Sequence, residues 1–371
     1  MPTYNDLRPK DDLDKKDYAL IFPDMLKSEK KRTIKRLLEL REGLRNDVTM
    51  KKADNNLLLA SWNIKEFGHT TQRLAEAYFY IAEILSSFDL IVIQEVKSSL
   101  KDLYIVTSIL GSDWSYIIND ITEGDEGNSE RSAYIYNKKR VEFAGLAGEI
   151  TLWDDLTKNY DIKQLKRTPY ITGFKSGWKT FSIICLHLQP GNSDDDVSYR
   201  RTEVKLLLKA IEEKILKGRF WNDNIILAGD FNLYEGPDKD NPTIDMITNA
   251  GFKEVESLKG KDTNASQTEA YDRLFLRSNE YFTLGKNDLN KENGGVFNPF
   301  NYVYKTDEEL TYKNYMKQHY TGDQNLDDPT KLKKYYQHPW RKNQVSDHFP
   351  IWAELIIDSS DDFLKEKLES Y

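Results

Sequence analysis

The sequence has a single cysteine among its 371 residues and no long apolar run. One thiol, Cys185, cannot form a disulfide within the chain. The longest apolar runs, such as 225–228 and 90–93, are the length of a strand and far short of the roughly 20 residues that a membrane-spanning helix needs. The first residues, MPTYNDLRPKDDLDKK, are charged and lack the apolar stretch of a secretory signal. We therefore expect a cytoplasmic protein that has no membrane segment.

The sequence also has fewer basic than acidic residues, with 53 Lys and Arg against 61 Asp and Glu, which gives a net charge of −8. Nucleic-acid binding usually requires a basic surface, so this balance argues weakly against it. Net charge is a poor guide where a metal site gathers carboxylates, because the ion reverses their local effect. The basic residues occur in short groups, at 138–140, 166–167, 200–201, 331–334 and 341–342. Each group alone is typical of a solvated surface.

The chain changes character along its length. Residues 1–52 contain apolar residues at helical spacing between 25 and 44, with a basic polar face, which predicts a helical extension packed on the main domain. A partner-binding helix is the alternative. The catalytic domain is expected over 53–358, followed by a tail at 359–371. The segment 281–344 is too long and polar for a structureless loop, so we expect an insertion with helices of its own beside the functional site.

Short apolar runs rich in β-branched and aromatic residues recur from residue 57 onward. They lie at 57–62, 89–94, 132–137, 180–187, 224–229, 271–276 and 349–356. Helix-like segments lie between some of them, at 71–87, 98–110 and 198–217. Strands mixed with helices in this way predict a layered α/β or α+β domain.

Polar residues stand at the ends of these expected strands. They are Asn63, Gln94, Glu95, His187, Asp230, Asn232, Asp272, Asp347 and His348. Strand ends that meet along one edge of a sheet can bring such side chains together. Taken singly, each has a structural explanation: Asp230 and Asn232 could cap a turn, and His187 could be a satisfied core histidine. Their recurrence on one kind of element favours a site.

These residue types suit the hydrolysis of a phosphodiester. That reaction needs a hard cation with oxygen ligands, a base that aims water in line, donors for the developing negative charge and an acid for the leaving oxygen. Histidines, carboxylates and side-chain amides supply all of these. The sequence has no His-rich zinc pattern, no cysteine pair and no serine elbow, which argues against other hydrolytic chemistries.

Eight segments in chain order resemble the motifs of the endonuclease/exonuclease/phosphatase superfamily, and most of all its deoxyribonuclease I-like members. They are SWNIKEFG (61–68), DLIVIQEVKSSL (89–100), SERSAYIYN (129–137), KRTPYITGF (166–174), ICLHLQPG (184–191), LAGDFNLY (227–234), AYDRLFL (270–276) and VSDHFPIWAEL (345–355). The resemblance implies a four-layer α/β sandwich, in which two packed mixed β-sheets are flanked by helices. It also implies a Mg²⁺-dependent phosphodiesterase, with Mn²⁺ as an alternative ion.

The resemblance further implies a role for each matching residue. Glu95 would be the principal magnesium ligand, supported by Asn63 and Asp347. The expected phosphate or substrate contacts are Arg167, Lys97, Arg131 and Lys65.

Two histidines would carry out the acid–base chemistry. His348 would be oriented by Asp272, and His187 would be oriented by Glu130, because a carboxylate fixes the tautomer and favours the imidazolium. Which histidine is the acid and which is the base stays open. Asp230 would position or deprotonate the attacking water, and Asn232 would hold the scissile phosphate.

Departures from the pattern bear on the substrate. The disulfide of secreted members is absent, Lys97 replaces an arginine, and the minor-groove tyrosine falls near Asn128, so the same mode of duplex binding is open to question. The inositol phosphatases carry a Trp-Cys or similar pair before the Asp-Arg strand, where this chain has Glu269-Ala270-Tyr271, and this favours a nuclease.

The leading interpretation is an endonuclease that hydrolyses DNA by in-line attack of an activated water. The alternatives are a phosphoesterase acting on inositol phosphates or another small phosphoester, and a catalytically quiet partner-binding protein of the same fold. A protein partner could bind through 1–52 or 281–344.

Overall fold

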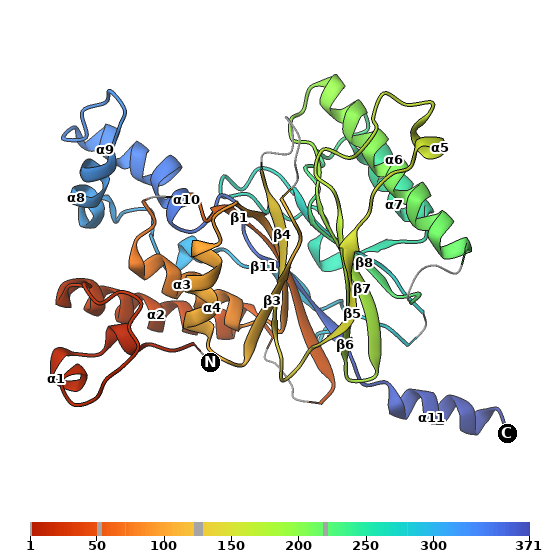
Figure 1. The fold of residues 1–371 in the computed structure, drawn as a ribbon, viewed down its shortest axis with the longest axis horizontal. Coiled ribbons are helices and arrows are strands. Elements are labelled where there is room, and N and C mark those ends of the chain that lie inside the picture. Colours follow the sequence, from red (N-terminus) through yellow and green to blue (C-terminus); the bar gives the residue numbers. More distant parts are fainter. Residues whose placement is uncertain (1, 50–53, 71, 122–128, 218–221, 280) are drawn as a thin grey trace.

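Two six-stranded mixed β-sheets pack face to face, with helices covering both outer faces (Figure 1). The computed structural model describes residues 2–49, 54–70, 72–121, 129–217, 222–279 and 281–371. This architecture confirms the expected four-layer α/β sandwich. No helix among these residues is both long and apolar enough to cross a membrane.

The first sheet contains the first three apolar runs of the sequence and the last one. Its strands, in spatial order, are β11 (Gly294–Val296), β12 (Ile351–Ile356), β1 (Asn56–Phe67), β2 (Leu90–Val96), β4 (Arg131–Asn137) and β3 (Trp114–Ile118). The neighbours β1 and β2 run parallel, and the other pairs are antiparallel. Both parallel strands therefore carry their carboxyl ends to the same edge of the sheet.

The second sheet repeats this arrangement. Its strands, in spatial order, are β5 (Glu142–Glu149), β6 (Tyr170–Ser176), β7 (Lys179–His187), β8 (Ile225–Asp230), β10 (Asp272–Arg277) and β9 (Lys253–Glu254). Here β7 and β8 form the parallel pair. The seven apolar runs found in the sequence became β1, β2, β4, β7, β8, β10 and β12.

Three apolar cores hold the layers together. One lies between the sheets and includes Leu59, Val92 and Ile226, all fully buried. A second packs the first sheet against α3 (Ala75–Ser86), α4 (Lys101–Leu110) and α2 (Lys27–Asp47). The third packs the second sheet against α6 (Asp194–Leu216), α7 (Asn241–Asn249) and α5 (Asp154–Thr157).

The N-terminal extension and the insertion before the last strand pack on the same side of the molecule (Figure 1). The extension comprises a 3-10 helix at Asn5–Leu7, α1 (Lys10–Leu13) and α2, and the boundary expected after residue 52 lies outside the described residues. The insertion contains a 3-10 helix at Pro299–Asn301, α8 (Glu309–His319), α9 (Pro329–Tyr335), a π-helix at Tyr336–Trp340 and α10 (Arg341–Gln344). A further 3-10 helix lies at Glu256–Leu258. The expected tail contains α11 (Ser360–Glu369).

The two segments are joined through α3. The guanidinium of Arg32, on α2, donates from Nε at 2.7 Å to Glu76 on α3, and Tyr312 on α8 donates to the same carboxylate at 2.7 Å. Glu76 is 1% exposed. A buried carboxylate of this kind requires charged and hydrogen-bonding partners, so it ties the extension to the insertion.

Candidate active site

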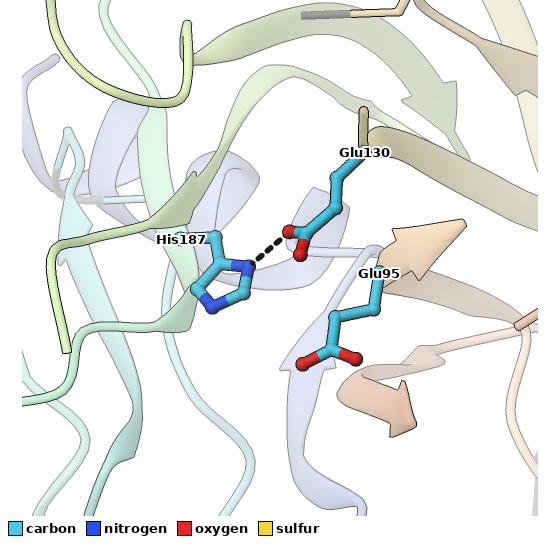
Figure 2. A group of neighbouring side chains, drawn as sticks. All are labelled: Glu95, Glu130 and His187. Carbon is cyan, nitrogen blue, oxygen red and sulfur yellow. Dashed lines mark ion pairs between the residues drawn. The ribbon is translucent and has the colours of Figure 1, made fainter. Parts of the chain in front are cut away.

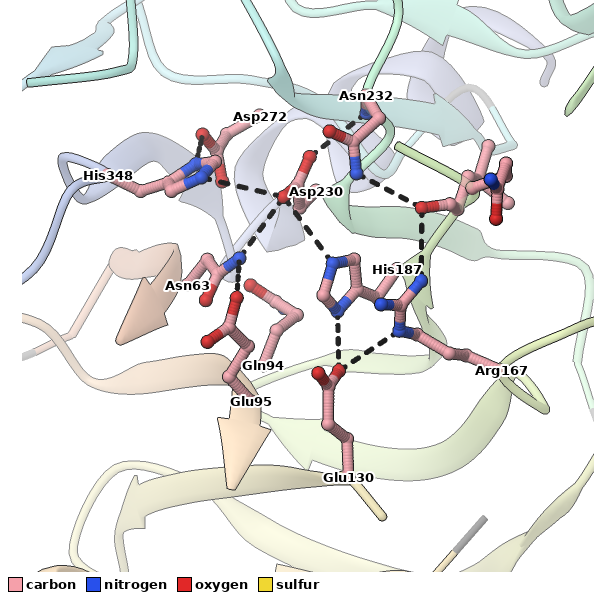
Figure 3. Close-up of polar contacts among 12 residues, drawn as sticks. Asn63, Gln94, Glu95, Glu130, Arg167, His187, Asp230, Asn232, Asp272 and His348 are labelled. Carbon is pink, nitrogen blue, oxygen red and sulfur yellow. Dashed lines mark hydrogen bonds and ion pairs between the residues drawn. The ribbon is translucent and has the colours of Figure 1, made fainter. Parts of the chain in front are cut away.

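The polar strand ends meet at one edge of the sandwich (Figure 3). In the second sheet, the parallel pairing of β7 and β8 sets His187 opposite Asp230, and the antiparallel pairing of β8 and β10 sets Asp230 opposite Asp272. In the first sheet, Asn63 lies opposite Gln94 on β2, immediately before an irregularity in the pairing of β1, which continues to Phe67. The register of these five strands therefore places the polar groups of each sheet side by side.

Asp230 occupies the centre of this cluster. Its Oδ2 lies 3.7 Å from Nε2 of His187 and 3.7 Å from Nε2 of His348, and it accepts a hydrogen bond from the Asn63 amide at 3.1 Å. Its Oδ1 accepts the backbone N–H of Asn232 at 2.9 Å. The side chain is 2% exposed. One buried carboxylate oxygen thus faces two imidazoles and one amide.

His348 is held by a buried carboxylate on its far side. Its Nδ1 lies 2.8 Å from Oδ2 of Asp272, and that oxygen also accepts the hydroxyl of Thr263 at 2.7 Å. Burial alone would lower the pKa of the His348 imidazole, but the carboxylates of Asp272 and Asp230 outweigh burial and raise the pKa well above its ordinary value. His348 is therefore poised to carry a proton at neutral pH.

His187 has the matching arrangement on the other side of Asp230. Its Nδ1 lies 2.9 Å from Oε2 of Glu130, although the ring N–H is not aligned well enough on that oxygen for a hydrogen bond. Glu130 also pairs with Arg167 at 3.0 Å and Lys97 at 3.2 Å. Burial raises the pKa of Glu130, but the interactions with His187, Arg167 and Lys97 outweigh it and hold the pKa well below its ordinary value. Glu130 is therefore a permanent anion.

The predicted phosphate-binding cations are paired within the site. Arg167 and Lys97 both contact Glu130, and Arg131 donates to the backbone carbonyl of Ser98 at 3.1 Å. Arg131 and Arg167 line one small pocket together with Glu130 and other site residues. Lys65 pairs with Asp347 at 2.9 Å. A substrate phosphate would have to share these cations with the carboxylates that now hold them.

The predicted metal ligands present oxygen atoms that suit a hard cation. The Asn63 amide donates to Oε1 of Glu95 at 3.1 Å, while its own carbonyl oxygen is buried without a hydrogen-bond partner among the described residues. Such an orphaned oxygen is costly unless a ligand completes it. Burial would raise the pKa of Asp347, but the charges of His348 and Lys65 keep it below its ordinary value, so this carboxylate is ionised. The donor set fits Mg²⁺.

The backbone at Glu95 is strained. This residue has φ +61°, in the left-handed region that a side chain rarely adopts, at a cost of about 1–3 kcal/mol. The backbone N–H of Glu66 donates to Oε2 of Glu95 at 2.9 Å and helps to hold it there. Figure 2 shows Glu95 beside the Glu130–His187 pair, and one ligand atom from each of these three lies within 4.8 Å of the others. A second such group is formed by Asp230, Asp272 and His348.

The sequence is similar to proteins that are named deoxyribonucleases. No family model matches the chain. Rat deoxyribonuclease gamma is 26% identical over 270 residues, which cover 68% of this chain and 80% of the rat protein. Human deoxyribonuclease-1 is 28% identical over 236 residues, which cover 60% of this chain and 77% of the human protein.

A solved structure has the same fold. The human nocturnin catalytic domain aligns over 81% of this chain and 93% of its own, with a TM-score of 0.51 and 13% identity. The chain is deoxyribonuclease I-like: its sequence is similar to these deoxyribonucleases, and its fold is shared with this solved structure. The similarity to deoxyribonucleases supports a hydrolase that acts on phosphodiester bonds. The resemblance read from the eight sequence segments is thereby confirmed, whereas the role of each site residue stays a prediction.

Two residues that sequence reasoning did not single out form hydrogen bonds with residues of the candidate site. The Ser346 hydroxyl donates to the backbone carbonyl of Asn63 at 2.7 Å and accepts the backbone N–H groups of Lys65 and His348, both at 3.1 Å. Thr263 donates to Asp272 and lies nine residues before it in the sequence. Ser346 lies within the last motif, two residues before His348, which is a signal that sequence reasoning could have used. Thr263 has no such signal, and Asn128 lies outside the described residues.

Proposed function

We propose that this protein is a Mg²⁺-dependent endonuclease that hydrolyses DNA. The observation that carries the proposal is the position of Asp230 between two imidazoles, each backed by a buried carboxylate. The same aspartate accepts the Asn63 amide, which also contacts Glu95. Asp230 therefore lies next to the two imidazoles and to the amide that contacts Glu95. In-line hydrolysis of a phosphodiester requires a proton acceptor, proton donors and oxygen ligands for a metal ion close together, and these groups can supply them.

The residues of the chain divide the reaction among them. Asp230 orients the attacking water and accepts its proton. His348, kept protonated by Asp272, donates a hydrogen bond or a proton to the phosphate, and His187 does so from the other side of Asp230. These donors are fixed before the substrate arrives, so they stabilise the developing charge without rearrangement.

The remaining groups hold the substrate. The side-chain amide of Asn232 donates to the backbone carbonyl of Leu188 at 3.0 Å, which fixes its orientation toward a phosphate. Glu95, Asn63 and Asp347 would hold the ion, which when bound polarises the phosphoryl oxygens. Arg167 and Lys97 add positive charge next to His187.

DNA is favoured as the substrate by two observations. The relatives reported above are deoxyribonucleases. In addition, this chain has Glu269-Ala270-Tyr271 before the Asp-Arg strand. The inositol phosphatases of the family that the sequence resembles carry a Trp-Cys or similar pair there. The cytoplasmic location expected from the sequence stays a prediction, and cell fractionation would test it.

Covalently closed plasmid tests the proposal because it has no ends. With Mg²⁺ the purified protein is expected to convert the plasmid to nicked circles, and EDTA is expected to abolish the reaction. Restoring Mg²⁺ or Mn²⁺ after EDTA serves as the control for irreversible damage. Cleavage that survives chelation would contradict the metal requirement. A protein that leaves plasmid intact but releases phosphate from inositol phosphates would establish the alternative substrate class.

A further inference from the structure

The last part of the insertion is a continuous helical run that carries positive charge only. Residues 329–344, through α9, the π-helix and α10, read PTKLKKYYQHPWRKNQ. Five of these sixteen residues are Lys or Arg, one is His338, and none is Asp or Glu. The whole chain carries a net charge of −8, so this run departs from the character of the molecule.

The run has one buried face and one basic face. Leu332, Tyr336 and Trp340 recur every four residues and are at most 1% exposed, and the two aromatic rings stack at 5.6 Å between centroids. Lys331, Lys334, His338 and Lys342 recur at spacings of three, four and four, which follow the helical repeat along another face. Lys331, Lys334 and His338 are exposed, and Lys342 is half-buried. We call these four residues the basic stripe.

The lysines of the basic stripe have no anionic partner in the part of the chain that the structure describes. Among the described residues, no carboxylate forms an ion pair with Lys331, Lys334 or Lys342, whereas Lys313 and Lys317 on α8 both pair with Asp327 at 2.9 Å. The Lys342 ammonium contacts only a hydroxyl in the described chain, that of Ser266 at 3.4 Å. Positive charge held on a rigid helix without partners is available to an external anion.

One end of the basic stripe is fixed beside the active site. Gln344 is fully buried and donates from its side chain to the backbone carbonyl of Gln72 at 2.9 Å. Arg73 donates to the backbone carbonyls of Gln344 and Lys65, both at 3.1 Å. These bonds couple α10 to the part of β1 that carries Asn63 and Lys65. Figure 1 shows α10 next to the end of β1.

Lys342 also contacts the loop that packs on the catalytic histidine. In that loop Asn264 forms a β-bridge with His348, and the backbone N–H of Ala265 donates to the carbonyl of Asp347 at 2.7 Å. Ser266, the partner of Lys342, is the next residue. The basic stripe therefore begins at the rim of the site and leads away from it along α10 and α9.

We propose that the basic stripe binds the sugar-phosphate backbone of the DNA strand that leaves the active site. Eleven residues separate Lys331 from Lys342, or about 16 Å of helix at 1.5 Å per residue. Measured along the axis of a duplex, that length corresponds to about five base pairs at 3.4 Å per nucleotide of each strand. Contacts of this kind position the substrate without reading its bases. The inference rests on the proposed function and adds a binding surface that is separate from the catalytic centre.

A triple variant with a matched control tests the inference. In Lys331→Gln/Lys334→Gln/Lys342→Gln three positive charges are removed from the basic stripe. The control, Lys27→Gln/Lys31→Gln/Lys35→Gln, removes three exposed lysines at helical spacing from α2. The measurements are kcat/KM on a short DNA duplex over a range of salt concentrations, and kcat/KM on bis(p-nitrophenyl) phosphate, which is too small to reach the stripe.

The expected result is a loss that is specific to DNA and sensitive to salt. Each phosphate contact contributes about 0.9 to the slope of log affinity against log salt, so three contacts account for about 2.7. The ratio of the wild-type kcat/KM on duplex to that of the stripe variant is then expected to fall by about 40-fold between 50 and 200 mM salt. The ratio of duplex to small-ester kcat/KM is expected to fall in the stripe variant and to stay at the wild-type value in the α2 control.

The outcomes separate this inference from the proposed function. If the stripe variant and the α2 control cleave duplex with the same salt slope as the wild-type protein, the basic stripe does not bind DNA. An equal loss in both triple variants would also overturn the inference, because it would report net charge alone. If the wild-type protein hydrolyses the small ester but leaves every DNA substrate intact, the proposed function itself fails.

Discussion

At the scale of single residues, Asp230 is the group on which the site depends. Its Oδ2 is the shared neighbour of His187, His348 and Asn63, so any change in its charge affects both imidazoles and the amide at once. The Asn63 amide and the backbone N–H of Asn232 both donate hydrogen bonds to this carboxylate, and an asparagine side chain at this position would have a similar shape. Replacing it should therefore affect the chemistry more than the fold.

Asp230→Asn is expected to lower kcat by about 10²-fold or more, the scale of a lost acid–base group. The amide has the same shape as the carboxylate but cannot accept the proton of the attacking water. Initial rates of plasmid nicking measure the effect, and a thermal unfolding curve checks that the variant is folded. Asp288→Asn, at an exposed position, is the matched control and should behave like the wild-type protein. A near-wild-type rate for Asp230→Asn would show that another group activates the water.

The charge on His348 leads to a prediction about pH. Asp272 and Asp230 raise the pKa of this imidazole well above its ordinary value, so the imidazolium persists through neutral pH and is lost only as the pH rises to the elevated pKa. Asp272→Asn removes a negative charge 2.8 Å from Nδ1, which favours the neutral ring and lowers that pKa. The alkaline limb of the kcat/KM profile is then expected to move to lower pH by about 1–3 units.

The pH–rate profile of Asp272→Asn, compared with that of the wild-type protein and of Asp288→Asn, tests this expectation. A variant that loses activity equally at every pH, with its alkaline limb in place, would mean that Asp272 orients the ring without controlling its charge. Thr263→Val would separate the two roles further, because it removes a hydrogen bond to Asp272 at 2.7 Å but leaves both charges.

The site residues that the sequence revealed are those that share one pattern, a polar residue at or just after the end of an apolar run. His187, Asp230 and Glu95 each follow or end an apolar strand, and strand pairing alone brings such ends together. Thr263 could not be found in this way, because its contact with Asp272 depends on the path of a loop. Likewise, the pairing of Lys97 and Arg167 with one carboxylate depends on side-chain geometry that no spacing reveals.

At the scale of elements, the sequence identified the strands that are buried on both faces. Such strands read as continuous apolar runs, and β8, with every residue buried, is one of them. The missed strands lie at or near sheet edges. Residues in β5 alternate between exposed and half-buried and include two glycines, and β9 and β11 are only two and three residues long. Edge strands of this kind lack the apolar run that marks a central strand.

The ends of helices depend on local chemistry that a periodic pattern does not contain. The sequence placed one helix over 198–217, whereas α6 begins at Asp194. The Ser193 hydroxyl accepts the backbone N–H of Asp196 at 3.2 Å, and three aspartates occupy the first turn. A capping serine and acidic residues stabilise the amino end of a helix, so the polar residues before 198 extend it.

At the scale of the whole molecule, the extension and the insertion pack against each other. The sequence offered both segments as possible partner-binding regions, but in the structure they contact each other through Glu76. Arg36 on α2 adds an ion pair with Glu308, just before α8. These contacts show that α2 helps to hold in place the insertion that carries the basic stripe.

Removing residues 1–49 is consequently expected to destabilise the whole protein. Five aliphatic side chains of the extension are at most 6% exposed: Leu7, Leu37, Leu40, Leu44 and Val48. At about 1.5–3 kcal/mol for each buried side chain, their loss amounts to about 7–15 kcal/mol, which is comparable to the total stability of a typical domain. The deletion also leaves the Glu76 carboxylate without Arg32. The expected result is an insoluble protein, or a Tm lower by about 10 °C or more.

Removal of 361–371 is the matched control, because none of the residues of α11 is buried. The Tm of this control variant should stay close to that of the full chain. A soluble product with an unchanged Tm and a full rate of plasmid nicking would show instead that the extension is an accessory segment, and that the insertion holds its position on α3 alone.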